Sequence, residues 1–143
     1  MILFLDIDGV LHPIFPHEDR TDAENQHLSY LPHFAAVLRD FPAVRLVIAS
    51  DWRKRHTLDE LRDLLGDLGS RLIGATPVLE KIGLDWTGHR QREAMAYLEA
   101  EGLADVRWIA LDDDAENYFY DAPLIVCADG FRDAEEAALR AAL

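Results

Sequence analysis

The sequence predicts an α/β protein with a mainly parallel sheet that is covered by helices on both faces. Short apolar segments of strand-forming residues alternate with segments of helical spacing, which is typical of right-handed β-α-β units. The chain has 143 residues and half of them are apolar, which is enough for one hydrophobic core. We therefore expect a single domain over residues 1–143.

The first part of the chain is expected to form two strands, a flap and a helix. Residues 2–5 are an apolar run that suits a fully buried strand. Residues 9–31 are rich in Gly, Pro and polar residues, so we expect an irregular flap there. Apolar residues at helical spacing predict a helix over residues 32–39, which Pro42 ends, and residues 44–49 form a second apolar strand.

The alternation continues through the rest of the chain. Thr57 and Glu60 have the spacing of a capping box, which predicts a helix through about residue 65. The remaining expected elements are a strand over residues 71–75, a helix over 90–101, strands over 106–111 and 124–127, and a final helix that Asp133 caps.

Two groups of carboxylates directly follow predicted strands. Asp6 and Asp8 follow the first strand, and Asp112, Asp113 and Asp114 follow the strand over 106–111. Ligands bind at the carboxyl ends of parallel strands, so we expect both groups at one edge. Two carboxylates about 4 Å apart repel by roughly 4 kcal/mol at an effective dielectric constant near 20. A cation that prefers oxygen ligands relieves this repulsion, and we predict Mg²⁺.

Three residues after the second strand extend this candidate site. Ser50 ends an apolar strand, where its hydroxyl is well placed to donate to a phosphoryl oxygen. Trp52 has two readings, a surface that stacks on a base or ring, or ordinary packing. Arg53 is a candidate for binding a phosphate through two nitrogens.

These residues resemble an ordered set of motifs in a known superfamily. Asp6-x-Asp8-Gly9-Val10, Ser50, a later cation and Asp112-Asp113 resemble the four motifs of the haloacid dehalogenase (HAD) superfamily. The strings LDIDGVLHP, SDWR and LDDD resemble the HAD domains of Swiss army knife RNA-repair proteins. The resemblance extends from residue 2 to about residue 130. It implies a three-layer, HAD-type Rossmann-like fold, capless or with a minimal cap, because the flap at about 9–31 and the segment at about 66–88 are short.

The resemblance also implies a role for each candidate residue. Asp6 would attack phosphorus and form an aspartyl phosphate, and Asp8 would act as general acid and then as general base. Ser50 would hold the transferring phosphoryl group. The implied Mg²⁺ ligands are the Asp6 carboxylate, the Asp8 main-chain carbonyl, Asp112 and Asp113, and the implied substrate-binding residues are Gly9, Trp52 and Arg53.

The phosphate-binding cation is left open among three residues. The superfamily usually places a Lys, sometimes an Arg, near the start of the helix before the last acidic strand. Arg90 occupies that place, and Arg92 and Lys81 are the alternatives. Arg90 also has a reading as a solvated helix residue. Asp114 has no assigned role.

The resulting hypothesis is a Mg²⁺-dependent phosphomonoester hydrolase, which capless relatives suggest could act on polynucleotide ends in RNA repair. The alternatives are a phosphatase for small metabolites or nucleotides and an inactive HAD-like interaction module. A receiver-like signalling domain is disfavoured, because Ser50 stands where its phosphoacceptor Asp would end a middle strand, and no Lys follows residue 81.

Composition limits the partners and the location. Lys and Arg number 14 against 27 Asp and Glu, which gives a formal net charge of −13. This charge repels nucleic acid and acidic membranes, so no extended duplex binding is expected. The first apolar run is too short for a signal peptide or membrane span, which predicts a cytoplasmic protein. The single cysteine, Cys127, is expected to be a buried strand thiol, and the histidines are expected in the flap or on the surface.

Overall fold

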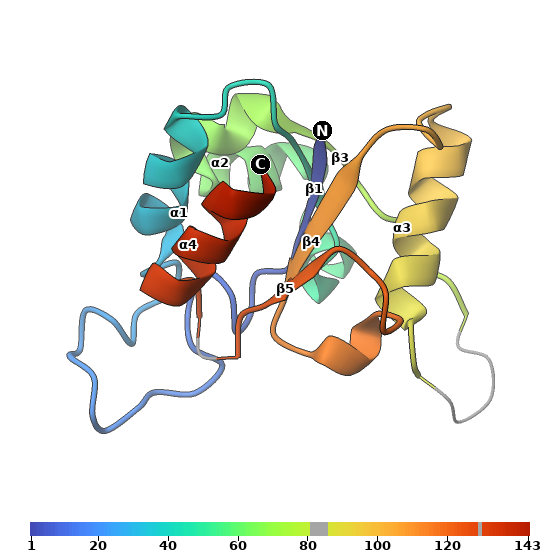
Figure 1. Ribbon diagram of the computed structural model, residues 1–143. Coiled ribbons are helices and arrows are strands. Elements are labelled where there is room, and N and C mark those ends of the chain that lie inside the picture. Colours follow the sequence, from blue (N-terminus) through green and yellow to red (C-terminus); the bar gives the residue numbers. More distant parts are fainter. Residues whose placement is uncertain (81–85, 129) are drawn as a thin grey trace.

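The computed structural model describes residues 1–80, 86–128 and 130–143, and a five-stranded parallel sheet lies at its centre (Figure 1). The strand order is β3-β2-β1-β4-β5, and every neighbouring pair is parallel. The strands are β1 (Ile2–Leu5), β2 (Arg45–Ile48), β3 (Leu72–Ala75), β4 (Trp108–Asp112) and β5 (Leu124–Val126). The chain winds outwards from β1 in one direction and then in the other, so the topological switch point lies between β1 and β4.

Helices cover both faces of this sheet, which confirms the predicted three-layer architecture (Figure 1). On one face lie α1 (Leu31–Arg39), α2 (Leu58–Leu64) and α4 (Asp133–Ala142), and on the other lies α3 (His89–Ala100). The alternating side chains of β1 serve the two cores in turn. Leu3 and Leu5 pack in the larger core with Phe34 of α1, whereas Phe4 packs in the smaller core with Tyr97 of α3.

The strand register brings the ends of β1, β2 and β4 to the same level. Leu5 is the partner of Ile48 on one side and of Leu111 on the other. The main-chain N–H of Asp6 donates to the Leu111 carbonyl at 3.0 Å. Residues that directly follow these strands therefore meet at one edge of the sheet, as the sequence predicts.

The predicted strands and helices agree with the structure within a few residues at their ends. The capping box is confirmed, because Thr57 Oγ1 accepts from the Glu60 N–H at 3.2 Å and the Thr57 N–H donates to the Glu60 carboxylate at 2.7 Å. The expected cap at Asp133 is wrong, since Arg132 occupies the N-cap position and Asp133 is the first helical residue. Three 3₁₀ helices were not predicted, η1 (Asp51–Lys54), η2 (Gly66–Arg71) and η3 (Ala115–Asn117).

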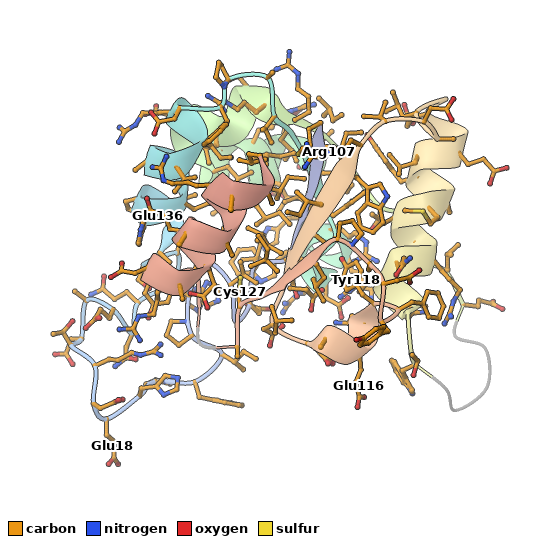
Figure 2. The ribbon with its side chains drawn as sticks, viewed as in Figure 1. Glu18, Arg107, Glu116, Tyr118, Cys127 and Glu136 are labelled. Carbon is orange, nitrogen blue, oxygen red and sulfur yellow. The ribbon has the colours of Figure 1, made fainter. Side chains whose placement is uncertain are left out.

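The flap between β1 and α1 is irregular, as expected, and its base is fixed to the body of the protein. The Tyr30 N–H donates to the Leu11 carbonyl at 2.8 Å, and the Phe131 N–H donates to the Val10 carbonyl at 2.7 Å. Glu18, at the far end of the flap, points away from the protein (Figure 2). The base of the flap therefore borders the sheet edge where the acids lie.

Two further expectations concern single features of the chain. Cys127 is fully buried just after β5 (Figure 2), and burial raises the pKa of its thiol far above the usual range. This thiol is therefore protonated and inert at neutral pH. Among the described helices, none has the length and apolar character needed to cross a membrane.

Candidate active site

Three carboxylates converge at the carboxyl ends of β1 and β4. One oxygen from each of Asp6, Asp112 and Asp113 lies within 4.8 Å of the others. Asp6 and Asp112 are buried, with exposed fractions of 7% and 0%, whereas Asp113 is half-buried. Buried acids this close together are unfavourable without a compensating charge.

The pKa of Asp6 reflects the unfavourable energy of placing these carboxylates close together. Burial raises its pKa to about 7, and the neighbouring Asp112 adds to the increase. The Ser50 hydroxyl, the Ile7 N–H and the Arg90 charge act in the opposite direction by favouring the ionised form. The Ile7 N–H donates to Asp6 Oδ1 at 2.7 Å. The site thus contains groups that support an ionised Asp6, and an added cation would support it further.

Asp112 presents one oxygen that the surrounding protein leaves unsatisfied. Its Oδ1 accepts from the Asp114 N–H and from the Asn117 side-chain amide, each at 2.9 Å. Its Oδ2 is buried and has no hydrogen-bond partner among the described residues. Burial raises the pKa of Asp112 to about 6. A buried carboxylate oxygen next to two further carboxylates fits a hard cation such as Mg²⁺.

Asp114 has a structural role and is not positioned as a metal ligand. Its side chain caps η3 by accepting from the Glu116 N–H at 2.9 Å, and the residue is exposed. The carboxylate group of Asp114 is also absent from the described cluster of possible metal ligands. Capping η3 orients the segment that carries Asn117, the donor to Asp112.

Gly9 makes room for Asp113. Its backbone is in the left-handed region at φ +72°, and a Cβ at this position would lie 2.6 Å from Asp113 Cγ. Such a contact is far inside van der Waals distance, so a side chain here would displace the third carboxylate. Gly9 also borders a small hollow with Asp113 and the flap residue Phe15. Its predicted part in substrate binding stays a prediction.

Gly9→Ala is therefore expected to weaken Mg²⁺ binding by about tenfold or more, the usual cost when a metal ligand loses its orientation. Gly102→Ala is the matched control, because Gly102 has φ +68° but nothing within 4 Å of an added Cβ. Titration calorimetry with Mg²⁺ separates the two effects. Equal Mg²⁺ affinities in the two variants would contradict a specific effect of the contact with Asp113.

Asp8 is oriented by two donors that come from different segments. The Trp52 indole N–H donates to Asp8 Oδ1 at 2.9 Å, and His12 Nε2 lies 2.9 Å from the same oxygen. The Leu28 N–H donates to His12 Nδ1 at 3.2 Å, so Nδ1 is the acceptor and the Nε2 proton points at Asp8. The Asp8 side chain keeps 44% of its surface exposed. It is thus fixed in direction and open to a substrate.

The expectation that the histidines lie in the flap or on the surface is wrong for His89, and His12 lies in the flap but is buried. His12 is only 3% exposed, and burial lowers its pKa below the usual range. His89 is buried at the start of α3, with Nε2 3.3 Å from the Glu93 carboxylate. The position of His12 four residues after Asp8 was the available signal, but only the folded flap shows the contact.

Arg90 is the described cation candidate whose charge acts on Asp6. It reaches across to Asp51 at 2.7 Å and to Glu93 at 3.2 Å, and its charge lowers the pKa of Asp6. Arg92 instead donates to the Thr87 carbonyl at 2.9 Å, and its guanidinium lies over the Phe119 ring. The third candidate, Lys81, lies outside the described residues.

Arg53 is not available to a phosphate in this conformation. Its side chain is 3% exposed, and each nitrogen of its guanidinium group donates to an acceptor in the protein. The acceptors are the Glu93 carboxylate at 2.7 Å and the carbonyls of Ala49, Ser50, Thr76 and Pro77. Through Glu93, which also contacts Arg90, it helps to fix the position of the Arg90 guanidinium group. Its geometry is that of a positioning residue.

Trp52 packs among imidazole rings. It is 9% exposed, stacks on His56 at a centroid distance of 5.2 Å, and lies 5.9 Å from His12 and 6.1 Å from His27. The packing reading therefore describes most of its surface, and its N–H is committed to Asp8. Trp52, His27 and His56 also border a hollow next to Asp8.

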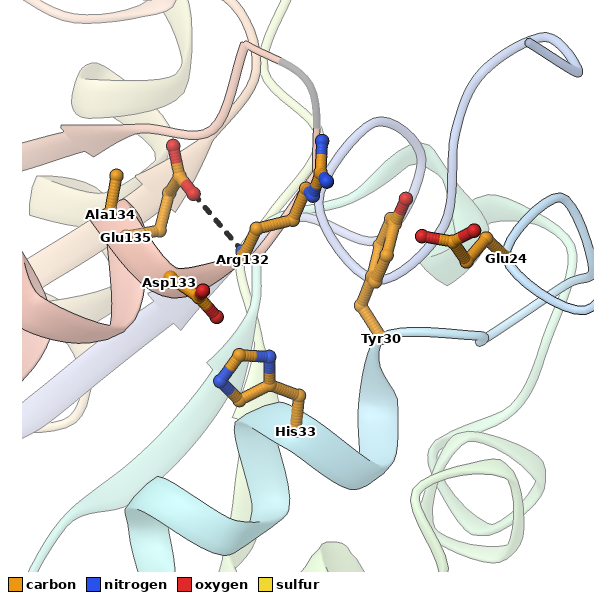
Figure 3. Close-up of a pocket in the computed structure, with 7 residues that line it drawn as sticks. All are labelled: Glu24, Tyr30, His33, Arg132, Asp133, Ala134 and Glu135. Carbon is orange, nitrogen blue, oxygen red and sulfur yellow. Dashed lines mark hydrogen bonds between the residues drawn. The ribbon is translucent and has the colours of Figure 1, made fainter. Parts of the chain in front are cut away.

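A separate hollow lies away from the acids, between the amino end of α4 and the segment that leads into α1 (Figure 3). It has a volume of about 480 Å³, and none of the clustered carboxylates lines it. Its lining residues are Glu24, Tyr30, His33, Arg132, Asp133, Ala134 and Glu135. The candidate active site is therefore the sheet edge and not this hollow.

Comparison with known families agrees with the geometry. The family model described as "HAD domain in Swiss Army Knife RNA repair proteins" matches residues 2–135. The match includes every residue of the carboxylate cluster, together with Asp8, Ser50 and Arg90. No curated protein matches the chain.

Proposed function

The chain belongs to the family of HAD domains in Swiss Army Knife RNA repair proteins, and we propose that it is a Mg²⁺-dependent phosphomonoester hydrolase with Asp6 as its nucleophile. The observation that carries this proposal is the cluster of the buried Asp6 and Asp112 with the half-buried Asp113, in which one Asp112 oxygen is unsatisfied among the described residues. Ser50 and Arg90 stand next to the same cluster and act on Asp6. The proposed nucleophile, the proposed cation site and the groups that would bind the phosphoryl oxygens are therefore close together at one edge of the sheet.

The first half of the proposed reaction transfers the phosphoryl group to the protein. An Asp6 oxygen forms a bond to phosphorus while the bond from phosphorus to the leaving oxygen breaks. Asp8 donates its proton to that leaving oxygen, which departs as an alcohol. His12 and Trp52 hold the Asp8 carboxyl in the required direction. The Ser50 hydroxyl and Arg90 would stabilise the negative charge of the phosphoryl oxygens.

The second half regenerates Asp6. Asp8, now ionised, takes a proton from water as the water oxygen attacks phosphorus, and the bond from Asp6 to phosphorus breaks. Inorganic phosphate leaves. Mg²⁺, held by Asp6, Asp112, Asp113 and the Asp8 carbonyl, would supply positive charge against the phosphoryl oxygens throughout.

Two observations bear on the substrate class, and they favour different kinds of contact with a nucleic acid. The family name refers to RNA repair, which favours phosphorylated polynucleotide ends. The net charge of −13 opposes contact along a long nucleic acid and favours a short terminal contact. A small phosphate ester or nucleotide is the second candidate, because the exposed Asp8 side chain admits either. An inactive interaction module remains the outcome if no ester is hydrolysed.

Phosphate release tests the function and ranks the substrates. The panel is a short oligonucleotide with a terminal phosphate, a nucleotide and an aryl phosphate, each assayed with Mg²⁺ and with a chelator. We expect release that requires Mg²⁺, with the oligonucleotide preferred. Release that is unchanged by the chelator would contradict the metal dependence, and a preference for the nucleotide would transfer the proposal to small substrates.

A further inference from the structure

A hollow lies next to Asp8, the proposed acid for the leaving group. It has a volume of about 560 Å³, against about 120 Å³ beside Gly9 and about 90 Å³ beside Arg90. Small-ligand pockets commonly measure about 300–1,000 Å³, so this hollow has room for a nucleotide-sized group. Its lining residues are Asp8, His27, Trp52, Arg55, His56 and Leu64, and we name it the Arg55 pocket.

Apart from Asp8, every ionisable residue that lines the Arg55 pocket is basic. Arg55 is exposed, and no carboxylate of the described residues lies within salt-bridge distance of it. His27 is exposed, and His56 is 3.8 Å from Glu60. In a protein with a net charge of −13, the guanidinium group of Arg55 places a positive charge beside the candidate site.

The position of Arg55 is set by the same turn that orients Asp8. Arg55 is the C-cap of η1, and its N–H donates to the Trp52 carbonyl at 3.0 Å. Trp52 and Leu64 give the pocket an apolar wall, against which a sugar or base can lie. The pocket therefore combines a fixed apolar wall with a guanidinium group that is free to bind an anion.

We propose that the Arg55 pocket binds a second phosphoryl group, carried by the leaving group of the substrate. This inference rests on the proposed function, because Asp8 can protonate a leaving oxygen only if the leaving group lies on its side of the site. The preferred substrates are then phosphomonoesters whose alcohol bears another phosphate. Bisphosphorylated nucleosides and the terminal nucleotide of a polynucleotide share this chemistry.

Equilibrium binding tests the pocket without turnover. The Asp6→Asn protein is titrated in Mg²⁺ with a nucleoside monophosphate, the corresponding nucleoside bisphosphate and a dinucleotide with a terminal phosphate. We expect the second phosphate to tighten binding about tenfold, the usual scale of one charge-assisted contact. Adding Arg55→Ala is expected to remove this gain and to leave the affinity for the monophosphate within about twofold.

Arg45→Ala is the matched control for the loss of one positive charge. Arg45 is exposed at the opposite, amino-terminal end of β2, and it should leave all the affinities unchanged. Equal affinities for the monophosphate and the bisphosphate, or a gain that survives Arg55→Ala, would overturn the proposal. A gain with the dinucleotide that equals or exceeds that with the bisphosphate supports a polynucleotide end, and a gain with the bisphosphate alone supports a small substrate.

Kinetic assays test the Arg55 pocket independently of the binding measurements. If the native protein hydrolyses none of these esters, the proposed function fails, and the binding ratio still decides whether the pocket holds a second phosphate. If hydrolysis occurs, Arg55→Ala should lower kcat/KM about tenfold for the bisphosphorylated ester only. An equal loss for the aryl phosphate would contradict a role confined to the leaving group.

Discussion

Asp6→Asn is expected to lower Mg²⁺-dependent phosphate release by a factor on the order of 10³ or more, the scale of losing a nucleophile. The substitution keeps the shape of the side chain, and the amide oxygen can still accept from the Ile7 N–H. An amide cannot form the aspartyl phosphate, so the reaction has no first step.

The same variant should not be less stable than the native protein when metal is removed. Burial and the neighbouring Asp112 raise the pKa of Asp6, so the ionised group is unfavourable in the folded state. A folded pKa above the unfolded value stabilises the protein at low pH, and this contribution is lost as pH rises to about 7. Asn is neutral at every pH, so the variant does not lose this stability as the pH rises. A melting temperature in chelator at pH 8 that equals or exceeds that of the native protein would separate lost chemistry from lost fold.

Asp114→Asn is the control for Asp6→Asn. Asp114 belongs to the same acidic run as Asp112 but caps η3, and Asn is also a good N-cap residue. Its activity should stay within about threefold of the native value. Near-native phosphate release by Asp6→Asn would contradict the account, and equal losses in both variants would indicate a general effect of charge.

Asp8→Asn is expected to slow the first step by about 10²–10⁴ for an alkyl ester and much less for an aryl ester. An alkoxide is a poor leaving group and needs the proton of Asp8, whereas an activated aryloxide departs unaided. The Asn oxygen can still accept from Trp52 and His12, so the local geometry is retained. The second step lacks its base with either substrate.

Rapid-mixing kinetics distinguishes these steps. With the aryl phosphate, Asp8→Asn should release a burst of about one aryl alcohol per active site and then turn over slowly, the signature of an accumulating covalent intermediate. With the alkyl phosphate no burst is expected. A slow reaction without a burst for both esters would show that the first step needs Asp8 even when the leaving group is activated.

The fold was accessible from the sequence because its signals are local. Apolar runs such as residues 2–5, the capping box of Thr57 and Glu60, and acids placed directly after strands each depend on neighbouring residues. The parallel register then brings Asp6 and Asp112 together without further information. The ends of elements were less accessible, as Asp133 illustrates, because a cap depends on backbone geometry that several nearby polar residues can satisfy.

Contacts between distant segments account for what the sequence did not reveal. His12 is a flap residue by composition, but the fold buries it against Trp52 and gives it a hydrogen bond to Asp8. Arg53 follows a strand in the expected place, yet its partner Glu93 lies forty positions further along the chain. Arg55, which has no salt bridge among the described residues, lines the neighbouring hollow, and no local pattern distinguishes it from Arg53.

Trapping the covalent intermediate tests directly whether Asp6 is the nucleophile. The native protein is mixed with an aryl phosphate and Mg²⁺, quenched during turnover and treated with borohydride, which reduces an aspartyl phosphate to homoserine. Mass spectrometry of the peptide that contains residues 2–12 then identifies the modified position. We expect homoserine at position 6 in the native protein and none in Asp6→Asn. Turnover without modification at position 6, or modification at another acid, would contradict this role of Asp6.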